Sequence, residues 1–177
     1  MPETAETRTA PHRRAEPPRS GAGERASLVA FLQYQRETLA MKCAGLTADQ
    51  LRERAVPPSE MSLLGLVRHL AEVERSWFGS VLNGEDPHAH WRSRVPGEHA
   101  DFDVADADPD EAFEIWHAQC ARSRALVDAT DSFDATVRFR DEEYSLRYIL
   151  THMIEEYARH NGHADFLRER IDGVTGE

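Results

Sequence analysis

Four long stretches of the sequence repeat apolar residues at helical spacing, and this pattern limits the fold more than any other feature. They cover about residues 24–44, 63–82, 109–129 and 146–171. In each stretch, apolar side chains recur three and four positions apart, which places them on one face of a helix. Four amphipathic helices of this length bury their apolar faces against one another. The sequence therefore predicts an all-α protein, built as a four-helix bundle.

Residues suited to helix ends border these stretches. Ser62 and Ser145 stand at N-cap positions, and Asp108 precedes Pro109, a residue suited to the first helical turn. Asp172-Gly173 follows the last helix, where a glycine can end it in the left-handed conformation. These signals fix the expected helix ends independently of the apolar pattern.

The connections between the helices differ in length. A capping box that starts at Thr47 predicts a short helix over residues 48–54, and the alternating residues 136–144 predict a short extended piece. The connections before and after the second long helix are long enough for crossovers, so up-down-up-down order is not required. The second of them, residues 85–108, carries several aspartates but fails the EF-hand pattern, which predicts a solvated acidic loop. Its aspartates include Asp101, Asp103, Asp106 and Asp108.

The first 23 residues differ in composition from the rest of the chain. They contain four prolines and almost no large apolar side chains, so they cannot offset the entropy lost on ordering. We expect residues 1–23 to form a disordered tail and residues 24–177 to form one helical-bundle domain. The tail lacks the apolar region of a signal peptide.

Charge and apolar content exclude several functional classes. The formal net charge is -11, a field that repels phosphate backbones, so we expect no nucleic-acid partner. No apolar run is long enough to cross a bilayer, and we expect no membrane partner. The two cysteines, Cys43 and Cys120, fit reduced thiols. Together these features predict a cytoplasmic protein.

Residues 152–163 contain three histidines and two glutamates within the last predicted helix. Glu156 and His160 are four positions apart, so their side chains lie one above the other on the same helix face. That face is otherwise apolar, where a carboxylate and an imidazole are costly unless a partner satisfies them. A divalent metal ion is one such partner, and a structural hydrogen-bonded pair is the alternative.

A metal site in a bundle needs a further ligand from another helix. His69 is the candidate in the second long helix, although it lies on the shoulder of the apolar face, where a histidine is often only packed. Glu74 lies nearer the centre of that face and is either a competing ligand or a buried ion-pair partner. Helical spacing alone does not choose between them.

Two segments of the chain resemble a known superfamily. Residues 63–74, followed by Trp77 and Phe78, look like the second helix of the DinB/YfiT-like superfamily, and residues 152–163 look like its fourth helix. In particular, the chain resembles the actinobacterial mini-circle-protein branch, and the resemblance extends over about residues 24–173. This resemblance implies a DinB/YfiT-type four-helix bundle with long crossover loops.

The resemblance also implies a ligand set. Many members hold a metal with one histidine of the second helix and two histidines of the fourth, and His69 and His160 match the outer two positions. Glu156 occupies the middle position, which is similar to mycothiol-dependent maleylpyruvate isomerase, where two histidines and a glutamate hold zinc. His69, Glu156 and His160 are thus the implied metal ligands, with His152 and His163 beside them. Zinc is the first candidate metal; nickel, manganese and iron(II) are others.

The activity that the resemblance implies is thiol chemistry assisted by the metal. The expected protein is an S-transferase or isomerase that uses a small-molecule thiol such as mycothiol; a metal-dependent hydrolase and a non-catalytic metal-binding or stress-response bundle are the alternatives. Arg147, Tyr157 and Arg159 are candidates to contact the thiol. Superfamily members often dimerise, so we expect a homodimer. Cys43 and Cys120 lie on apolar faces and are poor nucleophile candidates.

Overall fold

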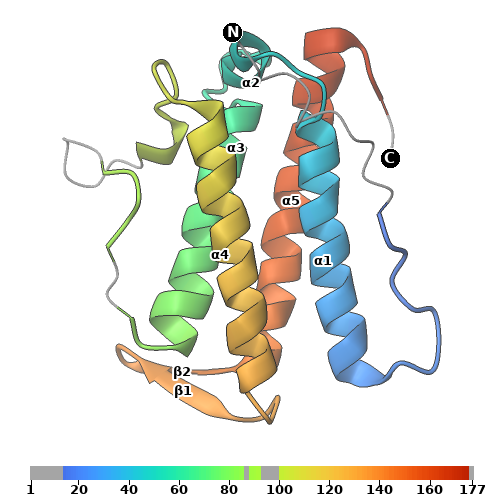
Figure 1. Cartoon of the computed structure of the whole chain (residues 1–177), viewed down its shortest axis with the longest axis vertical. Coiled ribbons are helices and arrows are strands. Elements are labelled where there is room, and N and C mark those ends of the chain that lie inside the picture. The colour runs from blue at the N-terminus through green and yellow to red at the C-terminus, as the bar shows by residue number, and fades with distance from the viewer. Residues whose placement is uncertain (1–13, 86–87, 93–99, 176–177) are drawn as a thin grey trace, which may run out of the picture.

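The computed structural model describes residues 14–85, 88–92 and 100–175, and four long helices dominate them (Figure 1). The prediction of an all-α bundle is confirmed. The long helices are α1 (Gly23–Cys43), α3 (Leu63–Glu74) with its continuation η1 (Arg75–Leu82), α4 (Pro109–Ala129) and α5 (Leu146–Asp172). The short elements are α2 (Ala48–Arg52), η2 (Ala100–Phe102), β1 (Thr136–Phe139) and β2 (Glu142–Ser145).

The predicted caps hold the helix ends. Ser62 and Ser145 each accept a hydrogen bond from a backbone N–H of the first turn of α3 and α5. Thr47 forms the expected capping box, and Asp108 caps α4 ahead of Pro109. Gly173 ends α5 with a φ of 78°, a conformation in which a side chain would be strained. Local sequence therefore sets where the helices begin and end.

The helices do not simply alternate in direction. The colours of Figure 1 show that α1 and α5 run one way, whereas α3 and α4 both run the other way. The connection from α3 to α4 must therefore return along the bundle, as a crossover. The connection from α1 to α3, which contains α2, stays at one end of the bundle. Of the two connections expected to be long enough, one is thus a crossover.

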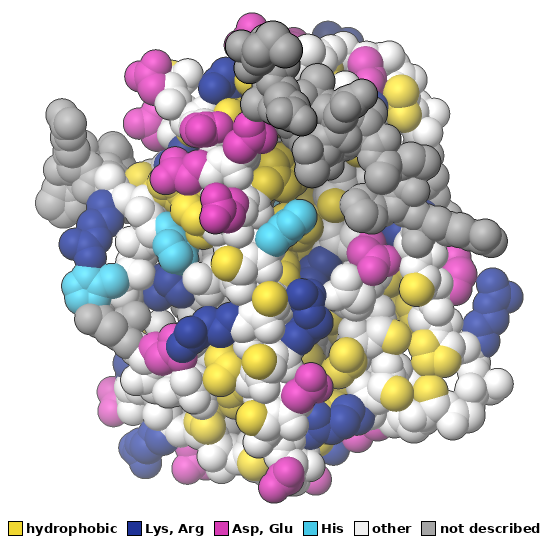
Figure 2. Space-filling view, in the orientation of Figure 1, with side chains coloured by type: hydrophobic (Ala, Val, Ile, Leu, Met, Phe, Trp, Pro, Cys, Tyr) yellow, Lys and Arg dark blue, Asp and Glu magenta, His cyan; other side chains and the backbone are white. Residues whose placement is uncertain are grey.

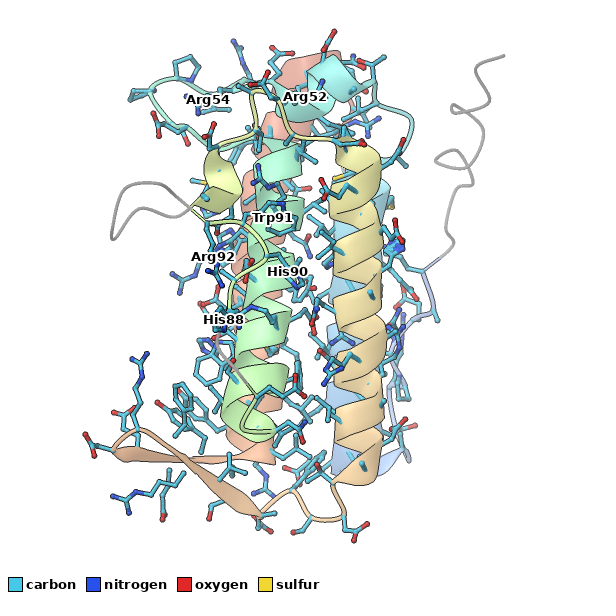
Figure 3. All side chains as sticks on the ribbon, turned by 60° about the vertical axis from the view of Figure 1, so that its left-hand side comes forward. Arg52, Arg54, His88, His90, Trp91 and Arg92 are labelled. Carbon is cyan, nitrogen blue, oxygen red and sulfur yellow. The ribbon has the colours of Figure 1, made fainter. Side chains whose placement is uncertain are left out.

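Part of the crossover packs against α3. Residues 88–92 lie over this helix, as the labelled side chains of Figure 3 show. The backbone N–H of His90 donates to Glu72, and the guanidinium of Arg68 lies 4.7 Å from the centre of the Trp91 ring. The 3₁₀ turn η2 follows and also packs against α3, where Phe102 lies beside Gly65 and His69. These contacts bring the acidic connection to the flank of the bundle.

The second long helix is not α-helical throughout. The sequence predicts one helix over residues 63–82, but the structure changes from α-helix to π-helix after Glu74. A π-helix has a wider turn than an α-helix, and such segments occur often at functional sites. The change of pitch alters which side chains face α5 over the segment that contains Trp77.

A β-hairpin closes one end of the bundle (Figure 1). Strands β1 and β2 are antiparallel, with Val137 opposite Tyr144, where the sequence predicts a short extended piece. The hairpin packs against η1 and α5, and the ring of Tyr144 lies 5.5 Å from that of Trp77. It therefore adds an aromatic side chain to the flank formed by η1 and α5.

The core lies between the four helices and is made mainly of aliphatic side chains, with a few aromatic and polar side chains among them. Its central members are fully buried leucines, isoleucine, valine and methionine from α3 and α5: Leu63, Leu66, Val67, Leu70, Ile149, Leu150 and Met153. Burial of such side chains stabilises a fold by about 1.5–3 kcal/mol each.

In the part of the chain that the structure describes, no helix is both long and apolar enough to span a membrane.

Residues 1–13 of the predicted tail lie outside the described residues. Residues 14–22 form neither helix nor strand, and their first member contacts α1. Arg14 donates to the hydroxyl of Thr38 at 2.8 Å and lies over the ring of Tyr34. The division of the chain into tail and domain stays a prediction.

Candidate metal centre

One face of α5 presents a row of four polar and aromatic side chains. Tyr148, His152, Glu156 and His160 follow one another at intervals of four residues, so they lie along the same side of the helix. Glu156 lies between the two histidines. Its Oε2 is 3.5 Å from Nε2 of His160, and its Oε1 is 3.5 Å from Nε2 of His152. All three of these side chains are partly buried.

His69 reaches the same place from α3. Its ring centre lies 4.7 Å from that of His160, edge to face. One potential ligand atom each from His69, Glu156 and His160 lies within 4.8 Å of the other two. The structure therefore brings together the three residues that the sequence proposes as ligands, although they are up to 91 positions apart (from 69 to 160).

Asp101 was not expected at this site. The sequence predicts a solvated acidic loop over residues 85–108, and for Asp101 this prediction is wrong. Its side chain is 8% exposed, and its Oδ2 lies 2.8 Å from Nδ1 of His69. A carboxylate can only accept here, so Nδ1 of His69 donates, and in a neutral imidazole this leaves the lone pair on Nε2. Carboxylates commonly orient metal-binding histidines in this way.

Two further contacts restrict the imidazole rings of His69 and His160. The ring of Phe102, next to Asp101 in η2, stacks on His69 with ring centres 5.3 Å apart. On the other side, Nδ1 of His163 lies 3.3 Å from Nδ1 of His160. Since His160 has its Nε2 towards Glu156 and its Nδ1 towards His163, both ring nitrogens have a defined neighbour.

His160 is neutral at physiological pH. Burial, followed by the neighbouring charge of His69 and His163, lowers the pKa of His160 to about 4. A histidine must be neutral to bind a metal ion, so little proton competition is expected at this position. This property suits a ligand and would also suit a packed core histidine.

The donor set fits a divalent transition metal. Two imidazoles and one carboxylate are typical of catalytic zinc sites, which keep an open position for water or substrate. The same donors bind nickel, manganese or iron(II), so they do not select one metal by themselves. Asp101 provides the orienting carboxylate that such sites use. Because of this contact, the described residues fit a bound metal ion.

A second group of potential ligands overlaps the first. His152, Glu155 and Glu156 also place one ligand atom each within 4.8 Å of one another. Glu155, however, is paired with Arg159 through two contacts, the longer of 2.9 Å. Glu156 therefore belongs to both groups, and the one that includes His69 has the more buried side chains.

Glu74 is an ion-pair partner, which settles one alternative that the sequence left open. It is fully buried and accepts two hydrogen bonds from Arg36, at 2.7 and 2.8 Å. Burial alone would raise the pKa of Glu74, but the charge and hydrogen bonds of Arg36, with hydrogen bonds from Ser123 and Tyr157, lower it below the ordinary value. Glu74 thus contributes to a separate polar cluster.

This buried cluster also includes two of the side chains considered above. Tyr157 donates to Glu74 at 2.8 Å and accepts from the indole N–H of Trp116 at 2.8 Å. Cys120 lies beside both, with its Sγ 3.6 Å from Glu74. Burial raises the pKa of Cys120 to about 12, so its thiol is unreactive. We call Arg36, Glu74, Trp116, Cys120 and Tyr157 the buried polar network.

The arginines proposed for thiol binding are engaged on the surface. Arg147 pairs with Glu24 and Asp134, and Arg159 pairs with Glu155. Figure 2 shows basic and acidic side chains interspersed over the face formed by α1 and α4. The charged side chains on this face do not form one basic surface.

A family model described as mycothiol-S-transferase matches residues 27–173, which include every residue of the candidate site. No curated protein matches the chain.

Proposed function

Because this chain belongs to the mycothiol-S-transferase family, which is DinB/YfiT-like, we propose that it is a metal-dependent enzyme that transfers a small thiol, such as mycothiol, to an electrophilic substrate. The family match confirms the resemblance to the DinB/YfiT-like superfamily. It also favours transfer over the isomerase and hydrolase alternatives.

The convergence of His69, Glu156 and His160 carries this proposal. They come from two different helices, and their ligand atoms lie within 4.8 Å of one another. When bound there, a divalent metal such as zinc would lower the pKa of a thiol at its open position, so that thiolate is available at neutral pH.

The remaining residues of the site have positioning roles in this proposal. Asp101 holds the His69 ring in the tautomer that has a free Nε2, and Phe102 limits its rotation. His152 and His163 flank Glu156 and His160, respectively. Rigid placement of the donor atoms limits the reorganisation needed when metal and thiol bind.

Metal analysis of the purified protein tests the proposal. The wild type, prepared without chelator, should contain about one divalent metal ion per chain, and His160→Ala should contain less than about a tenth of that. Glu155→Ala, which changes an exposed neighbouring carboxylate, is the matched control and should retain the metal. Equal metal content in the wild type and His160→Ala would refute the metal site.

An activity assay separates the functional alternatives. The metal-loaded protein is incubated with an electrophile, with and without mycothiol, and the thioether product is measured by mass spectrometry. Product only in the presence of thiol supports transfer. Turnover of an ester or amide in the absence of thiol would indicate a hydrolase, and metal binding with no turnover would indicate the non-catalytic bundle.

A further inference from the structure

Four aromatic side chains gather at the end of the bundle that the hairpin closes. Trp77 lies at their centre: its ring centre is 4.2 Å from His152, 5.5 Å from Tyr144 and 6.1 Å from Tyr148. Tyr148 and His152 are nearly parallel, with an interplanar angle of 5°. We call Trp77, Tyr144, Tyr148 and His152 the aromatic platform.

The platform is assembled from three separate elements. Trp77 comes from the π-helical segment η1, Tyr144 from strand β2, and the other two from α5. The π-helical segment and the hairpin both depart from a plain four-helix bundle, and each contributes one ring. π-Helical segments occur often at functional sites.

The platform does not belong to the core. Tyr148 is 51% exposed, and Trp77, Tyr144 and His152 are only partly buried. Grouped aromatic side chains that remain in contact with water often mark a binding surface. Flat apolar groups bind well to such rings, because they add stacking interactions to the burial of apolar area.

The platform is continuous with the proposed metal ligands. His152 belongs to it and also contacts Glu156, with Nε2 3.5 Å from Oε1. Tyr148, His152 and Glu156 follow one another along the same face of α5. A molecule lying on the platform would therefore have one end beside the ligand cluster.

We propose that the aromatic platform is the acceptor subsite and binds the flat, apolar part of an electrophilic substrate, such as a conjugated aryl ketone. This inference rests on the proposed function, since it assigns the second substrate of that transfer. In the reaction, the sulfur–hydrogen bond of the thiol breaks and a sulfur–carbon bond forms at the β-carbon of the ketone. The carbon–carbon double bond becomes single, and the α-carbon gains the proton.

A pair of matched acceptors tests the subsite. Benzylideneacetone and ethylideneacetone differ only in having a phenyl or a methyl group on the reacting carbon. Tyr148→Ala should raise KM for benzylideneacetone about tenfold and leave KM for ethylideneacetone unchanged, because only the phenyl group lies on the ring that is removed. Phe166→Ala is the matched control, since Phe166 is a second exposed aromatic residue on α5, 67% exposed and about five turns away.

A binding measurement makes the result independent of the metal and the thiol. Benzylacetone has the phenyl group and the ketone but no double bond, so it cannot react. Its addition should shift the indole N–H resonance of Trp77, assigned with Trp77→Phe, and Tyr148→Ala should weaken the binding about tenfold.

The outcomes separate the two proposals. A wild type that binds benzylacetone at Trp77 but carries no metal or transfers no thiol would refute the proposed function alone. A wild type that transfers thiol but shows no shift at Trp77, or loses both acceptors equally in Tyr148→Ala, would overturn the acceptor subsite. Sedimentation identifies the remaining case: if Tyr148→Ala converts a dimer to monomers and no benzylacetone binds, a second copy covers the platform and the inference is wrong.

Discussion

Glu74 on α3 and Glu156 on α5 belong to the same bundle but have different surroundings. Glu74 is fully buried, and it accepts hydrogen bonds of 2.7–2.8 Å from Arg36 and Tyr157. Glu156 is partly exposed, and its two histidine contacts are 3.5 Å long. A carboxylate that is fully paired inside the core adds nothing that a ligand could use. A carboxylate with weaker contacts and two imidazoles beside it retains electron pairs for a metal.

The largest expected difference concerns stability. Glu74→Gln should lower the free energy of unfolding by about 3–5 kcal/mol, because it leaves the charge of Arg36 buried without a counter-charge. Glu156→Gln should change it by less than about 0.5 kcal/mol in the metal-free protein, since this side chain is near the surface. Denaturant unfolding of both variants measures the difference, and equal losses would remove the contrast between the two carboxylates.

The hydroxyl of Tyr157 tests whether the buried polar network acts as a unit. Tyr157→Phe removes the donor to Glu74 and the acceptor of Trp116 in one step. A loss of about 1.5–3 kcal/mol in unfolding free energy is expected, with metal content unchanged. Loss of the metal in this variant would show that the two clusters are coupled.

Asp101→Asn tests the orienting carboxylate of the ligand cluster. Metal affinity should fall about ten- to hundredfold, because the amide holds the His69 tautomer less firmly. Competition with a chromophoric chelator measures this change. Asp106→Asn, in the same acidic connection but exposed, is the control and should retain wild-type affinity.

The smallest effect is expected at the thiols. Burial raises the pKa of Cys43 and of Cys120 to about 12, so at pH 8 only about one molecule in ten thousand carries either thiolate. A thiol reagent should therefore leave the native protein unmodified and react with two thiols after unfolding. Rapid modification of the native protein would show that the buried polar network opens.

The sequence allowed the helices to be predicted better than the site. Caps such as Ser62, Ser145 and Gly173 act through neighbouring backbone groups, so the helix ends follow from local sequence. The switch to a π-helix after Glu74 was missed, because an eight-residue segment is too short to show a change of period. Helical spacing likewise could not separate His69 from Glu74, since both lie near one apolar face.

The contribution of Asp101 could not be predicted for a different reason. Its role depends on the path of the crossover, which brings a residue 32 positions away from His69 within 2.8 Å of it. In the sequence it is one aspartate among several, and spacing does not distinguish it from Asp103 or Asp106. An acidic connection that follows a helix with a candidate ligand is the only local signal that could have suggested it.

The crossover has a consequence for how this scaffold can change over evolution. The imidazole comes from a bundle helix, but the group that sets its tautomer comes from a connection outside the four long helices. Substitutions in that connection can therefore alter the affinity or preference for a metal at little thermodynamic expense to the helices. Related chains with the same bundle could acquire distinct metal requirements through changes in this connection alone.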